Sequence, residues 1–168
     1  VLDMLVRKAD KRNAAELNLL YYRLARTADA LGNTEKALRY YKAAYDLDPA
    51  YQPTLTARAA LLFKQQDWEG ALKLYQAILV QNGAGQSDDQ TIEAYHRLGV
   101  IKVKQGDKKR ALAFFEKALE IDSSHRQTLG AVIELQLGAG DIEAVVSAKR
   151  ALMPVADDAE RFRLYDEI

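Results

Sequence analysis

The sequence predicts an all-α fold in which antiparallel helix pairs stack as a solenoid, and three observations lead to that prediction. A glycine followed by Asn or Asp recurs at Gly32, Gly106 and Gly140, each time just before a helical apolar pattern. The stretch ALRYYKAAYDLDP at 37–49 is largely repeated as ALAFFEKALEID at 111–122. Small and aromatic residues keep the same places in both stretches. One helix pair cannot bury its apolar face alone, so the same side chains are needed in every pair.

Each of these glycines is expected to end one helix, and the Asn or Asp after it to begin the next. Glycine takes the left-handed conformation without a Cβ clash, while Asn or Asp accepts a hydrogen bond from a free helical N–H. Gln66 and Asp67 hold the same place in the second pair. The steps from turn to turn are 34, 40 and 34 residues, so the period is 34 with six extra residues in the middle step.

The residues around these turns resemble the tetratricopeptide repeat family. Its pattern has a Leu-Gly pair in the first helix, Gly-Asp at the turn, an Ala and an aromatic residue in the second helix, and a closing Asp-Pro. The third pair matches this pattern most fully, with Tyr95, Leu98, Gly99, Gly106, Asp107, Ala111, Phe115, Ala118 and Asp122. The resemblance implies a right-handed α-α superhelix of antiparallel helix pairs, with repeats at 18–51, 52–85, 92–125 and 126–158.

The other units depart from the pattern at specific places. The first has Ala25 where the family has glycine, and the second departs at Arg58, Gln66 and Ile78. The fourth aligns only if one residue is deleted after Asp141. Small residues are nevertheless expected at the close helix contacts, namely Ala37, Ala44, Ala59, Gly99, Ala111 and Ala118.

The two ends and the insertion carry weaker patterns. Residues 1–17 are expected to hold the end of a preceding repeat, with a short helix over 2–9, and the start of the first long helix. Residues 159–168 are expected to form a capping helix or the first helix of a further repeat. The six extra residues around 83–90 predict a surface loop, and a functional role for them stays open. Because the sequence starts with Val1 and has no signal-peptide pattern, we expect a piece of a longer protein.

Composition narrows the class of partner. The chain has 168 residues, 49% of them hydrophobic, which is enough to build a core. Its 24 basic and 24 acidic residues give zero net charge, which argues against a nucleic-acid partner. The longest apolar runs are far shorter than a membrane span, so no direct membrane insertion is expected. Absence of cysteine suits both reducing and oxidising compartments, so the cytoplasm is favoured only slightly and the periplasm stays open.

Signs of catalytic chemistry are weak. The sequence has no phosphate-binding glycine motif, zinc cluster or activated nucleophile, so we expect no catalytic, metal or cofactor site and no enzyme. Glu93, His96 and His125 are expected on one side of neighbouring helices, where either a metal or acid-base site or solvated groups of a polar groove would fit, the second being favoured. A basic cluster of Lys102, Lys104, Lys108, Lys109 and Arg110 allows a phosphate or acidic-peptide site, with a solvated surface favoured.

The resemblance also implies where a partner binds, because in the family the first helices of successive pairs line a concave groove. The groove residues that this implies in the four repeats are Leu19, Tyr22, Arg26, Asp29, Ala30, Pro53, Thr56, Ala60, Phe63, Lys64, Glu93, His96, Val100, Val103, Lys104, Gln127, Gly130, Glu134, Leu137 and Gly138. The rings of Tyr22, Phe63 and His96 are the expected anchors for a partner side chain. The clamp that some family members use for C-terminal carboxylates is not expected, since Arg97 alone fits its positions.

These observations predict a non-enzymatic scaffold that binds a peptide or protein surface in its concave groove, within a multiprotein assembly. The alternative is a targeting or substrate-presenting arm of a larger enzyme such as a glycosyltransferase. A third hypothesis is self-association through exposed terminal repeats, because an uncapped solenoid presents an apolar end.

Overall fold

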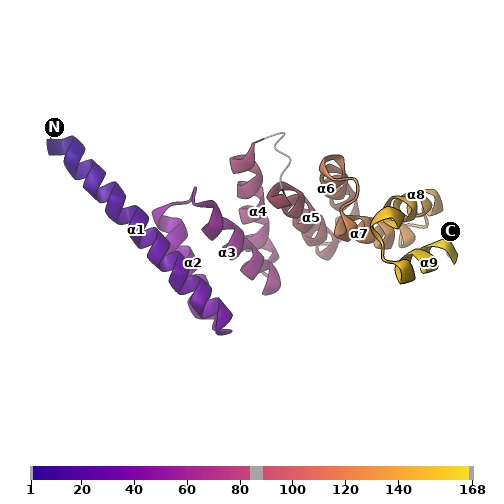
Figure 1. The fold of residues 1–168 in the computed structure, drawn as a ribbon, viewed down its shortest axis with the longest axis horizontal. Helices are drawn as coiled ribbons and strands as arrows, with labels where there is room; N and C mark the ends of the chain where they lie inside the picture. Colours follow the sequence, from indigo (N-terminus) through magenta and orange to yellow (C-terminus); the bar gives the residue numbers. More distant parts are fainter. Residues whose placement is uncertain (1, 84–88, 167–168) are drawn as a thin grey trace. The chain divides into compact units, whose positions relative to one another are not determined.

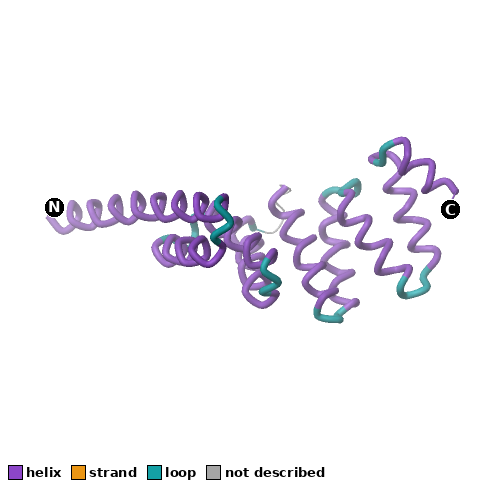
Figure 2. Tube along the Cα trace, turned by 90° about the horizontal axis from the view of Figure 1, so that it is seen from below, coloured by secondary structure: helices purple, strands orange, loops and turns teal. Residues whose placement is uncertain are grey.

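The structure is a computed structural model that describes the backbone of residues 2–83 and 89–166, and within these the side chains of 13–83, 89–159, 161, 163 and 164. Its helices, in chain order, are α1 (Leu2–Ala30), α2 (Thr34–Leu47), α3 (Gln52–Lys64), α4 (Trp68–Asn82), α5 (Asp89–Lys104), α6 (Lys108–Ile121), α7 (Arg126–Leu137), α8 (Ile142–Leu152), the short 3₁₀ helix η1 (Met153–Val155) and α9 (Asp158–Asp166) (Figure 1). Helices and loops make up all of the described backbone, as Figure 2 shows. None of the described helices is both long and apolar enough to cross a bilayer.

The chain divides into two compact units, residues 1–81 and 82–168. In the first unit α1 packs along α2, and α2 contacts α3. In the second unit α5 pairs with α6 and α7 with α8, while α7 also contacts α6 and α5. Consecutive helices therefore pair as predicted, and the all-α helical-repeat solenoid is confirmed as the fold class.

The turns between paired helices have the predicted left-handed residue. The φ angles of Gly32, Gly106 and Gly140 are 74°, 78° and 76°. Gln66, in the same place, has a φ of 61° and is the one non-glycine residue with positive φ among the described residues. The amide that follows each of them donates to a carbonyl in the last turn of the preceding helix, as Asn33 does to Ala28, which is the Schellman arrangement.

The predicted caps also form. The side chains of Asn33, Asp107 and Asp141 accept hydrogen bonds from the backbone N–H groups three residues further on. Asp67 does the same for Gly70, with an N–O distance of 2.9 Å. Each second helix thus begins on an Asn or Asp that satisfies a free donor of its first turn.

Small residues bring the helices of each pair close together. Ala37, Ala44, Ala59, Ala111 and Ala118 have no exposed surface, as predicted. In the first unit the core around Tyr41 contains Ala25, Ala28 and Leu61. In the second unit Phe115 holds the place of Tyr41 and packs with Leu129, Val132 and Leu135.

Gly99 on α5 lies directly against the ring of Phe115 on α6. A Cβ added to Gly99 would overlap three atoms of that ring. The Leu-Gly pair of the third repeat is therefore needed for the close approach of α5 to α6, as the resemblance implied.

The two ends differ in part from expectation. The short helix expected over 2–9 is not separate, because α1 continues without a break from Leu2 to Ala30. Near the other end α9 spans Asp158–Asp166. Gly83, with a φ of 74°, ends α4. Of the rest of the expected loop over 83–90, residues 84–88 lie outside the described residues, and Asp89 and Gln90 begin α5.

Candidate functional site

The expected groove residues of the second unit come from two helices in contact, α5 and α7. All of them except Glu93 and Leu137 line two pockets that share Ala131 and Glu134. The first has a volume of about 320 Å³ and is lined by Val100, Val103, Lys104, Lys108, Phe115, Ala131, Glu134, Leu135 and Gly138. The second has a volume of about 590 Å³ and is lined by His96, Arg126, Gln127, Gly130, Ala131, Glu134 and Leu152.

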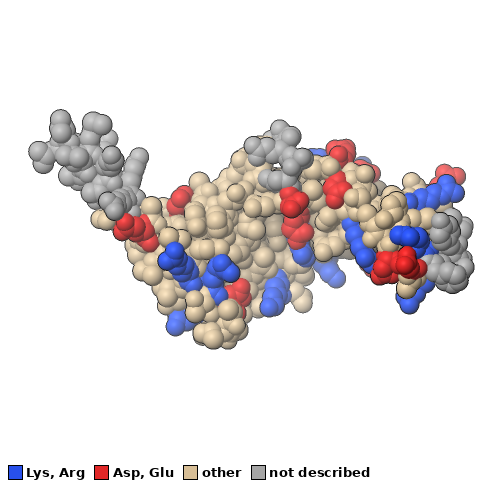
Figure 3. All heavy atoms as spheres, in the orientation of Figure 1, with Lys and Arg blue, Asp and Glu red and all other residues tan. Residues whose placement is uncertain are grey.

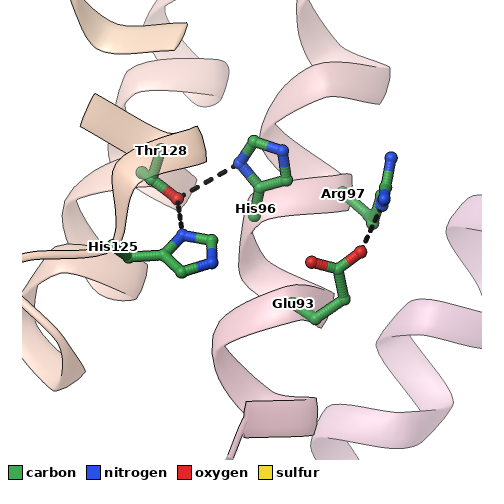
Figure 4. A network of polar contacts seen from close by, with 5 residues as sticks. All are labelled: Glu93, His96, Arg97, His125 and Thr128. Atoms are coloured by element: carbon green, nitrogen blue, oxygen red, sulfur yellow. Dashed lines mark hydrogen bonds and ion pairs between the residues drawn. The ribbon is translucent and has the colours of Figure 1, made fainter. Parts of the chain in front are cut away.

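The wall of the second pocket contains a histidine network that joins α5 to α7 (Figure 4). The Oγ1 atom of Thr128 lies 3.1 Å from Nδ1 of His96 and 2.7 Å from Nδ1 of His125. A hydroxyl has one proton, so it donates to one ring and accepts from the other. When both rings are neutral, one therefore carries its proton on Nδ1 and the other on Nε2.

His96 is buried, and this corrects one expectation. We expected Glu93, His96 and His125 to be solvated groups of a polar groove, but only 6% of His96 is exposed. Burial lowers the pKa of His96 to about 4; the nearby Glu93 carboxylate raises it and Arg97 lowers it. The ring is therefore neutral at pH 7. It is buried because it lies between α5 and α7, against the rings of Phe115 and His125.

Glu93 and Arg97 are engaged with each other on α5, one turn apart. Arg97 Nε lies 2.5 Å from Glu93 Oε1, and both side chains are roughly one-third exposed. Arg97, the residue that fits the family's carboxylate clamp, is thus already paired. In the described part of the chain, no group of three or more His, Cys, Asp or Glu residues is placed to hold a metal ion.

The first unit repeats this arrangement with different chemistry. Tyr22, Tyr51 and Thr54 hold the places of His96, His125 and Thr128. The rings of Tyr22 and Tyr51 meet edge to face with centroids 5.6 Å apart, the same distance as between the two histidines. The hydroxyl of Thr54 is buried and has no hydrogen-bond partner among the described residues.

The other expected groove residues of the first unit lie on α1 and α3. Arg26 and Lys64 are exposed, whereas Asp29 and Thr56 are half-buried. Burial first, and the Asp29 carboxylate second, raise the pKa of Tyr41 to about 12. Charged groups thus lie next to the buried tyrosine hydroxyl at this position of the first repeat.

The three rings expected to be anchors already pack against other rings of the chain. Tyr22 contacts Tyr41 and Tyr51, and Phe63 meets Trp68 edge-on with centroids 5.4 Å apart. Together with the burial of His96, this means that the three rings contribute to the packing of their own repeats.

Two members of the basic cluster have partners close by. Lys102 donates to Gln105, and Arg110 pairs with Asp107 at 3.4 Å. Lys104 and Lys108 instead line the smaller pocket. In Figure 3 basic and acidic residues are interspersed over the face that is drawn.

Sequence reasoning missed the role of Thr128. The signal was present, because Thr54 and Thr128 hold the same place in their repeats and follow a ring at the start of a first helix. A threonine near a helix start more often bonds to its own backbone, so the repeated position alone does not distinguish the two roles.

Comparison with known proteins agrees with the fold. Two family models, both described as tetratricopeptide repeat, match residues 20–51 and 52–124. The chain is similar to the crystal structure of MamA, at 16% identity and a TM-score of 0.73, covering 84% of this chain and 74% of that chain. It is also similar to the N-terminal domain of stress-induced protein-1 from C. elegans, at 21% identity and a TM-score of 0.64, covering 73% of this chain and 97% of that chain.

A third similar structure is YrrB, described as a TPR protein with an unusual peptide-binding site. It shares 18% identity at a TM-score of 0.64, covering 88% of this chain and 75% of that chain. With the repeat matched from residue 20 to residue 124 and the same fold in these structures, the chain belongs to the tetratricopeptide repeat family.

Proposed function

We propose that this protein-interaction scaffold binds a peptide or protein segment along the face formed by α5 and α7, as a non-enzymatic part of a multiprotein assembly. The observation that carries the proposal is the pair of adjoining pockets on that face. Both are lined by residues at the positions that the family uses for its concave groove. YrrB, which is similar in fold, is described as having a peptide-binding site.

The chemistry of the lining supports binding more than catalysis. The smaller pocket is mostly apolar, with a few charged groups at its edge, which is the usual composition of a recognition site. His96, the buried titratable group at the larger pocket, is neutral at pH 7 and hydrogen-bonded to Thr128. Glu93 is paired with Arg97. The contact of His96 with Thr128 joins α5 to α7 and the pair of Glu93 with Arg97 lies within α5, which supports a structural role for these groups.

The test compares substitutions on this face with the same substitutions elsewhere. The groove variants are Val103→Ser, Gln127→Ala and Glu134→Ala, at three residues with exposed side chains. The matched controls are Val80→Ser, Gln76→Ala and Glu116→Ala, on the second helices α4 and α6, where the side chains are also exposed. Each variant of the whole chain is used as bait in a lysate of the native host, and bound proteins are quantified by mass spectrometry.

We expect each of the three groove variants to lose the same bound protein. All three control variants should retain that protein. Circular dichroism must show equal helicity and melting for the six variants, so that lost binding is not lost folding. Equal retention by both sets would contradict the proposed groove and direct attention to the outward face.

A further inference from the structure

We infer that the smaller pocket between α5 and α7 recognises a peptide segment in which an apolar side chain stands beside an acidic one. This inference rests on the proposed function and adds the chemistry of the partner. The pocket's own residues supply both requirements, an apolar floor and two free ammonium groups at its edge.

The floor comes from three helices of the second unit. Val100 and Val103 project from α5, Phe115 from α6, and Ala131 and Leu135 from α7. Val103 is 38% exposed, so apolar surface is open to solvent here. With a volume of about 320 Å³ the pocket lies at the low end of the range of about 300–1,000 Å³ typical of ligand sites. A space of this size suits one or two side chains.

Two lysines stand at the edge of this floor. Lys104 ends α5 and Lys108 begins α6, and both line the pocket. Both are exposed, and within the described residues neither ammonium group has an ion pair or hydrogen bond. Glu134 is the one acidic residue in the lining, so the pocket carries an excess of positive charge. An acidic side chain beside the apolar one would complement that excess.

The fold itself does not require this combination. In the first repeat the places of Val100 and Val103 are held by Arg26 and Asp29, and those of Lys104 and Lys108 by Ala30 and Thr34. Lys108 also sits in the first turn of a helix, where a positive charge is mildly unfavourable. Lys104 lies in the last turn of α5, where a positive charge is favourable, so helix stability explains that residue in part. It does not explain Lys108, and both ammonium groups are left available at the pocket edge for recognition of a carboxylate.

The experiment starts from random dodecapeptides displayed on phage and selected against the whole chain. The most enriched sequence is synthesised with an amidated C-terminus, which removes the terminal carboxylate, and titrated by calorimetry. We expect it to place Leu, Ile, Met or Phe next to Asp or Glu. Its affinity should fall by about tenfold or more for the double variant Lys104→Glu, Lys108→Glu.

The matched control is Lys109→Glu, the same charge reversal at an exposed residue of α6 outside the pocket lining. We expect it to change affinity by less than about twofold. A peptide whose acidic residue is replaced by Lys should bind the double variant better than the original peptide does. Val103→Ser should weaken binding of the original peptide by reducing its apolar contact.

The outcomes separate this inference from the proposed function. If the selected peptide binds at full affinity to the lysine double variant but loses affinity with Gln127→Ala or Glu134→Ala, the groove stands and the acidic specificity is wrong. The same peptide is also titrated with a free C-terminal carboxylate; if that form binds and the amidated form does not, a terminal carboxylate is recognised and the side-chain carboxylate is wrong. If no peptide is enriched on the wild-type chain, both this inference and the proposed peptide groove fail.

Discussion

The imidazole rings of His96 and His125 meet edge to face with their centroids 5.6 Å apart, at a place where the first repeat has two tyrosines. The same packing thus occurs once with two phenol rings and once with two imidazole rings. Burial lowers the pKa of one of these imidazoles, His96, so protonation of that ring is linked to the stability of the second unit.

The first prediction is that acid destabilises the fold through His96. Its pKa is about 4 in the folded chain and about 6.5 when unfolded, so the unfolded state binds the extra proton first. Above pH 6.5 both states are neutral and the ring has no effect. As the pH falls from 6.5 to 4, the free energy of unfolding should drop by about 3 kcal/mol from this group. Urea unfolding at several pH values measures the drop.

The control for this prediction is His96→Gln, which removes the titrating ring and keeps a polar group. The difference in stability between wild type and variant should narrow steadily below pH 6.5. The second control is His125→Gln, which removes the other histidine of the chain. A pH profile that stays the same in His96→Gln would contradict the assignment of the acid sensitivity to His96.

The second prediction concerns one substitution at two equivalent threonines. Thr128→Val removes the hydroxyl that both imidazoles contact, and should cost about 1–3 kcal/mol of stability because polar ring nitrogens lose their partner. Thr54→Val removes a buried hydroxyl that has no hydrogen-bond partner among the described residues. It should be neutral or stabilise by up to about 1 kcal/mol. Chemical denaturation of both variants measures the two changes in the free energy of unfolding. Equal destabilisation by Thr128→Val and Thr54→Val would contradict the predicted difference between the two hydroxyls.

Local features of this fold were predictable from the sequence because each is decided within a few residues. The left-handed turn at Gly32 and the cap at Asn33 depend only on backbone sterics and one short side chain. The period then placed the same features at Gly106 and Asp107, and both are present.

The environment of His96 was not predictable in the same way. The repeat pattern predicts only the average direction of a side chain at each position. The burial of the His96 ring depends on His125 and Phe115, which lie outside α5. Likewise the smaller pocket needs Lys108 from the start of α6, a position outside the family's groove set. Side chains from three helices define that site, and no single repeat contains it.

The third prediction contrasts two helical glycines. Gly99→Ala should destabilise by about 2 kcal/mol or more, because its Cβ would overlap the ring of fully buried Phe115 and neither helix can move away cheaply. Gly130→Ala should stabilise by up to about 1 kcal/mol, because its Cβ would meet nothing within 4 Å and alanine favours a helix. Thermal melting of the two variants gives both signs. A neutral Gly99→Ala would mean that α5 and α6 are less closely packed than described.

The last prediction concerns the turn that lacks a glycine. Gln66 has a φ of 61°, a backbone conformation that is strained for a residue with a Cβ and unstrained for glycine. Glycine holds the same place in the other three turns between paired helices. Gln66→Gly should therefore stabilise the chain by up to about 1 kcal/mol, the gain in the folded turn being partly offset by the greater freedom of glycine in the unfolded chain. The neighbouring Gln65→Gly is the matched control, since Gln65 has a φ of −80° and gains nothing from glycine. We expect Gln65→Gly to lower the urea midpoint and Gln66→Gly to raise it. If both substitutions lower the midpoint by the same amount, the side chain of Gln66 stabilises the turn by more than its backbone strain costs.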